Sequence, residues 1–200
     1  MGVKLLSKLL KQECEDVTKQ LHLSELYGKK LCIDASIYMY RFKSNDSLLE
    51  SLYLMCSLFR TYNIDVIFVF DGKPGDEKQV EIQQRREDRR NKWILYDELI
   101  KKGNLTEQDQ KQLYKLKRTL TKIKQEDVEK TKQLLDNYGI KHIQAIGEAD
   151  KLCASLVIKK KVYAVLSEDM DLFAYGSLNV IRYLSLVNHT CIIYNLSLIH

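Results

Sequence analysis

The sequence Val162-Tyr163-Ala164-Val165-Leu166-Ser167-Glu168-Asp169-Met170-Asp171 joins a short apolar run to two aspartates two residues apart. Apolar runs of this length are typical of buried strands. Three earlier stretches have the same form, an apolar run followed closely by acidic residues. They are residues 31–33 before Asp34, residues 66–70 before Asp71, and residues 140–146 before Glu148 and Asp150. The sequence therefore predicts four strands with carboxylates just beyond their carboxyl ends.

The segments between these runs contain apolar residues at helical spacing. Residues 48–59, 113–120 and 127–138 have this pattern, and Gly139 is a candidate C-cap for the last of them. Strands that alternate with helices imply crossover connections. We therefore expect an α/β fold with a mostly parallel central sheet flanked by helices. Composition marks no boundary, so we expect one domain over residues 1–200.

The acidic residues should meet at one edge of this sheet, because ligands of such folds bind beyond the carboxyl ends of the strands. Carboxylates in one cleft repel each other unless cations neutralise them, and Mg²⁺ suits a loose acidic cluster because it keeps several of its waters. An aspartate at a strand-to-helix turn often only caps the helix, but capping does not explain acids that come in pairs. The predicted metal ligands are Asp34, Asp71, Glu148, Asp150, Asp169 and Asp171.

Other classes of site are disfavoured. The cysteines lie far apart without a C-x-x-C pair, which predicts free thiols rather than a zinc site or a disulfide framework. No apolar stretch reaches the ~18 residues of a membrane span, and no secretory signal is visible. We expect no membrane partner and an intracellular protein.

The formal net charge of +5 arises in one segment. Residues 73–132 contain 17 Lys and Arg against 12 Asp and Glu, whereas the rest of the chain contains 15 of each. A basic surface suits a polyanion such as nucleic acid. A solvated helical face with mixed charges explains the same composition. The segment is longer than one crossover connection requires, so we expect an insertion with a separate function.

Several short motifs resemble those of the flap endonuclease branch of the 5′ nuclease family, the xeroderma pigmentosum group G-like nucleases, and they occur in the family's order. They are M-G-V at 1–3 followed by Leu5 and Leu6, I-D-A-S at 33–36, V-F-D-G-K-P at 69–74, G-E-A-D at 147–150, and S-E-D-M-D at 167–171. The resemblance implies a PIN-like nuclease core that uses two Mg²⁺ ions, for which Mn²⁺ can substitute.

The resemblance also implies roles for individual residues. The six carboxylates match the family's metal ligands, with Asp150 in place of the more usual Glu. Lys78 and Arg85 match the pair that steadies the scissile phosphate, and their separation of close to two helical turns puts them on one face. Tyr40 matches an aromatic that stacks on a base near the cut, although an aromatic on an apolar helix is more often core. Gly2 matches a glycine near the metals.

Residues 76–132 correspond to the family's helical arch, or cap, through which a single-stranded 5′ end passes. A basic stretch that ends in an aromatic, Trp93, suits such a passage. The candidates for nucleic-acid binding there are Lys78, Arg85, Arg86, Arg89, Arg90 and Lys92.

The chain departs from the family pattern after Asp171, because no acidic residue follows it. Family members supply a further metal-binding Asp there, beside a helix-two-turn-helix element that grips duplex DNA. We expect this C-terminal part and a sliding-clamp-binding tail to be absent, and duplex binding and cleavage to be weakened.

Three functions follow from these features. The first is a structure-specific 5′ nuclease that acts on branched or 5′-ended DNA with a single-stranded 5′ segment, in replication, repair or recombination. The resemblance then implies the nucleus or another DNA-containing compartment, or the cytoplasm if the protein is viral or prokaryotic. The second is a related RNase with the same site. The third is a nucleic-acid-binding module whose incomplete metal site has weak activity or none.

Overall fold

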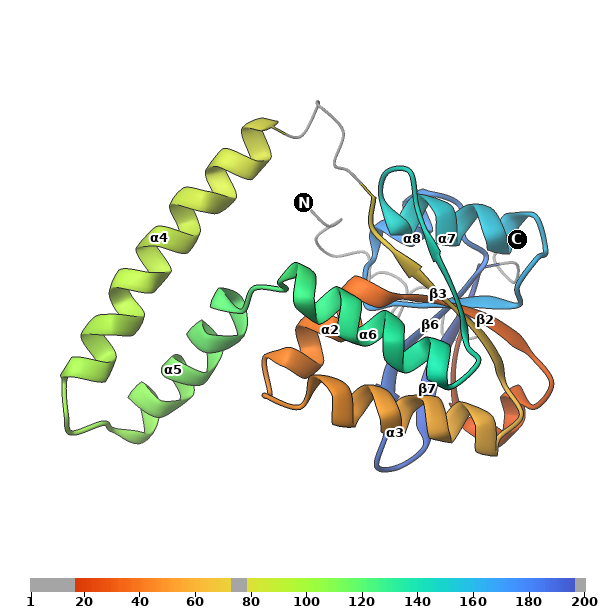
Figure 1. Ribbon diagram of the computed structural model, residues 1–200, viewed down its shortest axis with the longest axis horizontal. Coiled ribbons are helices and arrows are strands. Elements are labelled where there is room, and N and C mark those ends of the chain that lie inside the picture. The colour runs from red at the N-terminus through yellow and green to blue at the C-terminus, as the bar shows by residue number, and fades with distance from the viewer. Residues whose placement is uncertain (1–16, 73–78, 197–200) are drawn as a thin grey trace.

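The computed structural model describes residues 17–72 and 79–196, in which seven strands form one sheet in the order β1-β7-β6-β5-β2-β3-β4 (Figure 1). The strands are β1 (Thr18–His22), β2 (Lys30–Asp34), β3 (Asp65–Phe70), β4 (Lys141–Gln144), β5 (Ala164–Leu166), β6 (Asn179–Ser185) and β7 (Thr190–Asn195). The helices of these residues are η2 (Leu23–Leu26), α2 (Ala35–Lys43), α3 (Leu48–Thr61), α4 (Gln79–Lys101), α5 (Glu107–Leu120), α6 (Gln125–Asn137), α7 (Ala149–Ile158) and α8 (Asp171–Ala174).

Most neighbouring strands of the sheet run parallel. The parallel pairs are β2 with β3, β2 with β5, β3 with β4 and β5 with β6, whereas β7 pairs antiparallel with both β6 and β1. The α/β fold with a mostly parallel sheet is therefore confirmed. The four predicted strands correspond to β2, β3, β4 and β5, and their carboxyl ends lie at one edge of the sheet, here named the acidic edge.

Three strands were not predicted. β1 has the sequence T-K-Q-L-H, of which only Leu21 is buried, so it has no apolar run to reveal it. It becomes a strand because its backbone pairs with β7. The apolar character of β6 is interrupted by Arg182, which the structure buries.

Each central strand sends alternate side chains to opposite faces of the sheet. Leu31 and Ile33 of β2 join the core cluster that includes α2, α3 and α6, while Cys32 between them joins the cluster on the other face, with α7 and α8. This alternation is the period of two that a strand buried on both faces requires. The two clusters pack against opposite faces of the sheet and so hold its strands, and the residues at their ends, in place.

Helices α4 and α5 form a hairpin that extends away from the sheet (Figure 1). Its small apolar cluster consists of Leu99, Leu116 and Leu120, against which Tyr96 and Leu113 pack. Helix α6, in contrast, packs in the main core through its fully buried Leu135.

Helix α6 ends as predicted. Gly139 has a φ of +68° and donates its N–H to the carbonyl of Asp136 at 2.9 Å, which is C-capping geometry.

Cys32, Cys56, Cys153 and Cys191 are buried free thiols, as expected, and Cys14 lies outside the described residues. In the part of the chain that the structure describes, no helix combines the length and the apolar character of a membrane span.

Candidate metal centre

Asp34 ends strand β2 and begins helix α2. Its Oδ1 accepts hydrogen bonds from the backbone N–H groups of Ser36 and Ile37, at 3.0 and 3.4 Å, so it caps the helix. Its Oδ2 accepts from the hydroxyl of Ser167, which follows the neighbouring strand β5, at 3.2 Å. The capping explanation is therefore correct for one oxygen of Asp34. The other oxygen ties α2 to the segment that follows β5.

Asp71 follows strand β3 and joins two further elements. Its Oδ1 accepts from the backbone N–H of Ala149 at 2.9 Å, at the start of α7, and its Oδ2 accepts from the hydroxyl of Ser36 at 2.5 Å, in α2. The chain next to it is closely packed, because a Cβ at Gly72 would lie 2.1 Å from the carbonyl oxygen of Ala145. These contacts hold the Asp71 carboxylate beside the first turns of α2 and α7.

The pair after β4 lies at the start of α7. Glu148 occupies the N-cap position but makes no side-chain cap hydrogen bond, and its Oε2 lies 3.4 Å from the ammonium of Lys151. Asp150 follows in the first turn. Its Oδ1 is buried and has no hydrogen-bond partner among the described residues. Capping explains neither member of this pair.

The pair after β5 is ordered by local hydrogen bonds. The N–H of Asp169 donates to the hydroxyl of Ser167 at 3.1 Å, and the N–H of Asp171 donates to Oδ1 of Asp169 at 2.9 Å. Ser167 thus contacts Asp34 and Asp169 together.

The electrostatics of these groups show that they share one site. The pKa of Asp34 is raised to about 6, first by burial and then by the negative charge of Asp71. The pKa of Asp150 is raised to about 8, by burial and then by the charges of Asp34 and Asp169. The structure therefore brings Asp34, Asp71, Asp150 and Asp169 together at the acidic edge.

The donor set is compatible with a hard divalent cation. The buried, unpartnered oxygen of Asp150 lies among three other carboxylates, where a cation would supply both the missing partner and the missing positive charge. Within residues 17–72 and 79–196, no three His, Cys, Asp or Glu side chains form a ready-made metal site. Because Mg²⁺ takes water and substrate oxygens as ligands, an open cluster still suits it. The roles of the individual carboxylates stay predictions.

Two regions of the chain match one family. The XPG N-terminal domain matches residues 1–92, and the XPG I-region matches residues 139–199. The chain belongs to the XPG family. The two matches contain all six predicted metal ligands, and the residues between them include α5 and α6.

The chain is also similar to individual XPG-family proteins. It is 34% identical over 199 residues to flap endonuclease 1 of Caenorhabditis briggsae, covering 92% of this chain and 51% of the relative. It is 33% identical over 205 residues to flap endonuclease 1 of Candida tropicalis, covering 92% and 52%. The chain therefore spans about half the length of these relatives.

Solved structures have the same fold. The catalytic core of Rad2 in complex with DNA substrate superimposes with a TM-score of 0.70 at 20% identity, covering 97% of this chain and 55% of that one. Human GEN1 in complex with Holliday junction DNA gives a TM-score of 0.66 at 20% identity, covering 98% and 44%. The expected PIN-like nuclease fold is thereby confirmed.

The remaining residues implied by the XPG-family resemblance are placed less completely. Gly2 and Lys78 lie outside the described residues, and Arg85 and Arg86 lie on α4 but their side chains do not belong to the described part. On the same helix, Arg89 is partly exposed and Arg90, Lys92 and Trp93 are exposed.

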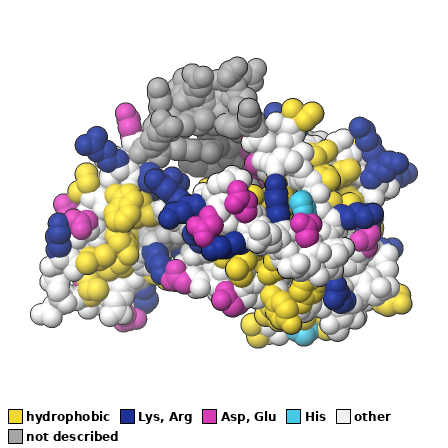
Figure 2. All heavy atoms as spheres, viewed as in Figure 1, with side chains coloured by type: hydrophobic (Ala, Val, Ile, Leu, Met, Phe, Trp, Pro, Cys, Tyr) yellow, Lys and Arg dark blue, Asp and Glu magenta, His cyan; other side chains and the backbone are white. Residues whose placement is uncertain are grey.

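Tyr40 lies on α2 with 44% of its surface exposed, so it is not a core residue. It lines a cavity of about 660 Å³ with Lys115 and Arg118 of α5 and Glu168 of the segment that follows β5. Figure 2 shows Lys and Arg side chains, interspersed with acidic ones, where the α4–α5 hairpin meets the rest of the molecule. Lys115 and Arg118 were not predicted as individual site residues, although they belong to the positively charged segment 73–132.

Some of the charge in the α4–α5 hairpin is internally paired. Lys102 contacts Asp109 at 2.7 Å and Lys111 contacts Glu107 at 2.9 Å. The mixed-charge explanation therefore accounts for these lysines.

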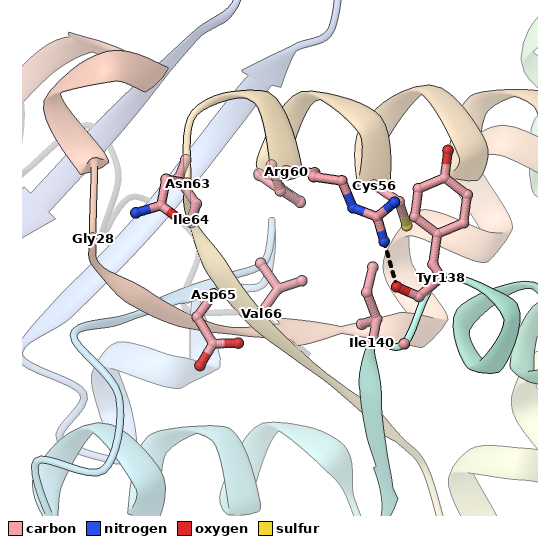
Figure 3. Close-up of a pocket in the computed structure, with 11 residues that line it drawn as sticks. Gly28, Cys56, Arg60, Asn63, Ile64, Asp65, Val66, Tyr138 and Ile140 are labelled. Carbon is pink, nitrogen blue, oxygen red and sulfur yellow. Dashed lines mark hydrogen bonds between the residues drawn. The ribbon is translucent and has the colours of Figure 1, made fainter.

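A second cavity, of about 410 Å³, lies at the opposite edge of the sheet, where β2, β3 and β4 begin (Figure 3). Arg60 and Asp65 lie on its wall, and Arg60 donates to the carbonyl of Tyr138 at 2.5 Å. This cavity is separate from the acidic edge.

Proposed function

We propose that this chain hydrolyses phosphodiester bonds in branched or 5′-ended DNA and that it depends on two Mg²⁺ ions, which Mn²⁺ can replace. The observation that carries the proposal is the buried, unpartnered Oδ1 of Asp150, surrounded by the charges of Asp34, Asp71 and Asp169. Four carboxylates gathered without a compensating cation destabilise the folded chain. Binding of divalent cations at this cluster would remove the repulsion between the carboxylates and so stabilise the folded chain.

The protein's own groups orient this cluster. Ser36 and the N–H of Ala149 hold Asp71, and Ser167 holds Asp34 and the N–H of Asp169. The proposed ligands are Asp34, Asp71, Glu148, Asp150, Asp169 and Asp171. A pair of divalent cations supplies Lewis acidity to the attacking and leaving oxygens of an in-line displacement. The acidic cluster would otherwise repel a phosphodiester, so cation binding and substrate binding are coupled.

The relatives support DNA as the substrate. Flap endonucleases are among the proteins that this chain resembles, and the Rad2 and GEN1 structures contain DNA. In this proposal, Lys78 and Arg85 steady the scissile phosphate, Tyr40 stacks on a base beside the cut, and the product carries a 5′-phosphate. The α4–α5 hairpin, with Arg86, Arg89, Arg90 and Lys92, would contact the single-stranded 5′ segment. The process served would be replication, repair or recombination.

Cleavage of a labelled 5′-flap DNA, with a matched RNA flap beside it, tests the proposal. Asp150→Asn should lower the DNA cleavage rate by at least about 100-fold, because replacing a residue that only orients a metal ligand already costs about 10–100-fold. Asp65→Asn is a matched control, because Asp65 begins the same strand that leads to Asp71 and lies at the opposite edge of the sheet. Equal cleavage by wild type and Asp150→Asn would contradict the proposal. Preferential cleavage of the RNA flap would favour an RNase.

Binding of the flap without any cleavage by the wild-type chain would favour the third function, a nucleic-acid-binding module. One observation supports that alternative. The oxygens of Asp34 and Asp71 already accept hydrogen bonds from the protein, so part of their capacity is used structurally.

A further inference from the structure

Arg182 is a buried cation in the middle of strand β6, and its contacts are directed at the segment that carries Asp169 and Asp171. Only 7% of its surface is exposed. Arginine is almost never buried unless its charge is paired. Its Nη2 donates to the backbone carbonyl of Glu168 at 2.9 Å, and its Nη1 contacts the sulfur of Met170. Both partners belong to residues 167–171, here named the acidic segment.

The charge of Arg182 is compensated by Glu168. Nε of Arg182 lies 3.7 Å from Oε2 of Glu168, and the guanidinium lies over the rings of Tyr183 and Tyr194, 4.9 and 5.8 Å from their centroids. The planar guanidinium is therefore held from several sides. Its rigid fork of donors can fix the orientation of the Glu168 peptide group better than a flexible ammonium could.

The backbone of β6 is shaped for this contact. The register of β6 with β7 shifts between Arg182 and Ser185, and Tyr183 has a φ of +55°. Such a conformation is energetically unfavourable for a residue other than glycine. It leaves the N–H of Tyr183 available to donate to Oε1 of Glu168 at 2.8 Å. Bulges recur beside active sites, where they redirect a strand.

The Glu168 side chain is therefore contacted by two elements, strand β6 and helix α2. Arg41 of α2 lies 3.9 Å from its Oε1 and donates to the carbonyl of Leu184 at 3.2 Å. In the described residues, the guanidinium of Arg182 forms an ion pair with Glu168 and with neither Asp169 nor Asp171. Arg182 therefore acts on the peptide group between Glu168 and Asp169 and on the side chain of Met170, without an ion pair to either aspartate carboxylate.

We propose that Arg182 is a positioning residue of the metal centre, an inference that rests on the proposed function. By holding the carbonyl of Glu168 and the side chain of Met170, it fixes the acidic segment so that Asp169 and Asp171 present their carboxylates to the cations. Residues that orient metal ligands typically change metal affinity about 10–100-fold when they are replaced.

The test measures Mn²⁺ binding directly, by the loss of the free-ion signal in electron paramagnetic resonance, with the full 200-residue chain. Arg182→Lys keeps the charge but loses the fork, and it should raise the apparent dissociation constant for Mn²⁺ about 10-fold. The Mg²⁺ concentration for half-maximal cleavage should rise in parallel, and high Mg²⁺ should restore most of the rate. A role in stability alone would lower the urea midpoint without changing either metal dependence.

Arg60→Lys is the control, because Arg60 also donates to a backbone carbonyl and lies over an aromatic ring, that of Tyr138, at the opposite edge of the sheet. It should leave Mn²⁺ binding unchanged. If Arg182→Lys does not fold, Glu168→Gln should give the same direction of change, since it weakens the hold on the guanidinium.

Three results would overturn the inference. Unchanged Mn²⁺ affinity in a folded Arg182→Lys variant would do so while leaving the proposed function intact, provided that Asp150→Asn weakens binding. If Arg182→Lys does not fold, an unchanged Mn²⁺ affinity in Glu168→Gln would likewise overturn the inference and leave the proposed function intact. Equal Mn²⁺ binding by wild type and Asp150→Asn would overturn both the inference and the proposed function.

Discussion

The carboxylate of Asp71 accepts a hydrogen bond from the backbone N–H of Ala149 at 2.9 Å, so the residue that follows β3 caps the helix that follows β4. The two residues are 78 positions apart in the sequence. The same carboxylate is a predicted metal ligand. The observed capping role and the proposed metal-binding role therefore fall on one side chain, and suitable substitutions can separate them.

Asp71→Asn should separate the two roles. The amide oxygen of Asn can still accept from Ala149, whereas the negative charge is lost, so we expect little change in stability and a large loss of cleavage. Asp71→Ala removes the cap as well and should cost about 0.5–2 kcal/mol of unfolding free energy. Urea unfolding and flap cleavage measure the two effects. Equal stability of the Asn and Ala variants would show that the cap contributes nothing.

The stability of the metal-free chain should depend on pH. The pKa values of Asp34 and Asp150 are raised to about 6 and about 8, from 3.8. At these two groups the folded state binds protons more tightly than the unfolded state, so their contribution to stability is fully present below the unfolded value of 3.8 and is lost as the pH rises through about 6 and about 8. Melting in EDTA between about pH 5 and about pH 9 should show this loss, and Mg²⁺ should reverse it most at high pH.

Asp150→Asn provides the control for that pH dependence, because its carboxamide does not titrate. We expect its melting temperature to fall less with pH than that of the wild type, while Asp65→Asn should follow the wild type. An identical pH profile for Asp150→Asn would contradict the shared-site explanation.

Gly72→Ala should destabilise the fold. An added Cβ would lie 2.1 Å from the carbonyl oxygen of Ala145 and 2.4 Å from that of Ile146, so the two backbone segments would have to separate. We expect a cost of about 1–3 kcal/mol. Gly147→Ala is the matched control, since a Cβ there would meet nothing within 4 Å, and it should change stability by less than about 0.5 kcal/mol. Equal losses of stability in the two variants would show that the close approach of the backbone to Gly72 does not exclude a side chain there.

Tyr40→Ala should weaken binding of flap DNA by about 1–3 kcal/mol if the ring stacks on a base. Tyr40→Phe keeps the ring and should bind as the wild type does. Tyr27, which is 70% exposed and lies in the turn before β2, offers a control in Tyr27→Ala. Fluorescence anisotropy measures the affinities. Weakened binding by Tyr40→Phe would point to the hydroxyl rather than to stacking.

Local sequence patterns were sufficient for the central strands, for helices α3 and α6, and for the acids after β2, β3, β4 and β5. The reason is that a run such as residues 66–70 is buried on both faces and stays apolar throughout. β1 could not be predicted in this way, because it is mostly exposed and exists through backbone pairing with β7. Short-range patterns contain no information about such a partner.

By itself, the sequence determined which carboxylates lie at strand ends and, through its motifs, which family the chain belongs to. Only the tertiary structure decided which carboxylate oxygens are not already used in hydrogen bonds within the protein. The Asp71 carboxylate accepts hydrogen bonds from Ala149 and Ser36, and Asp150 has an unpartnered oxygen. Arg182 holds the peptide group between Glu168 and Asp169, just before the second aspartate pair. These contacts join residues far apart in the chain, so they depend on the register and packing of the sheet, which no local pattern contains.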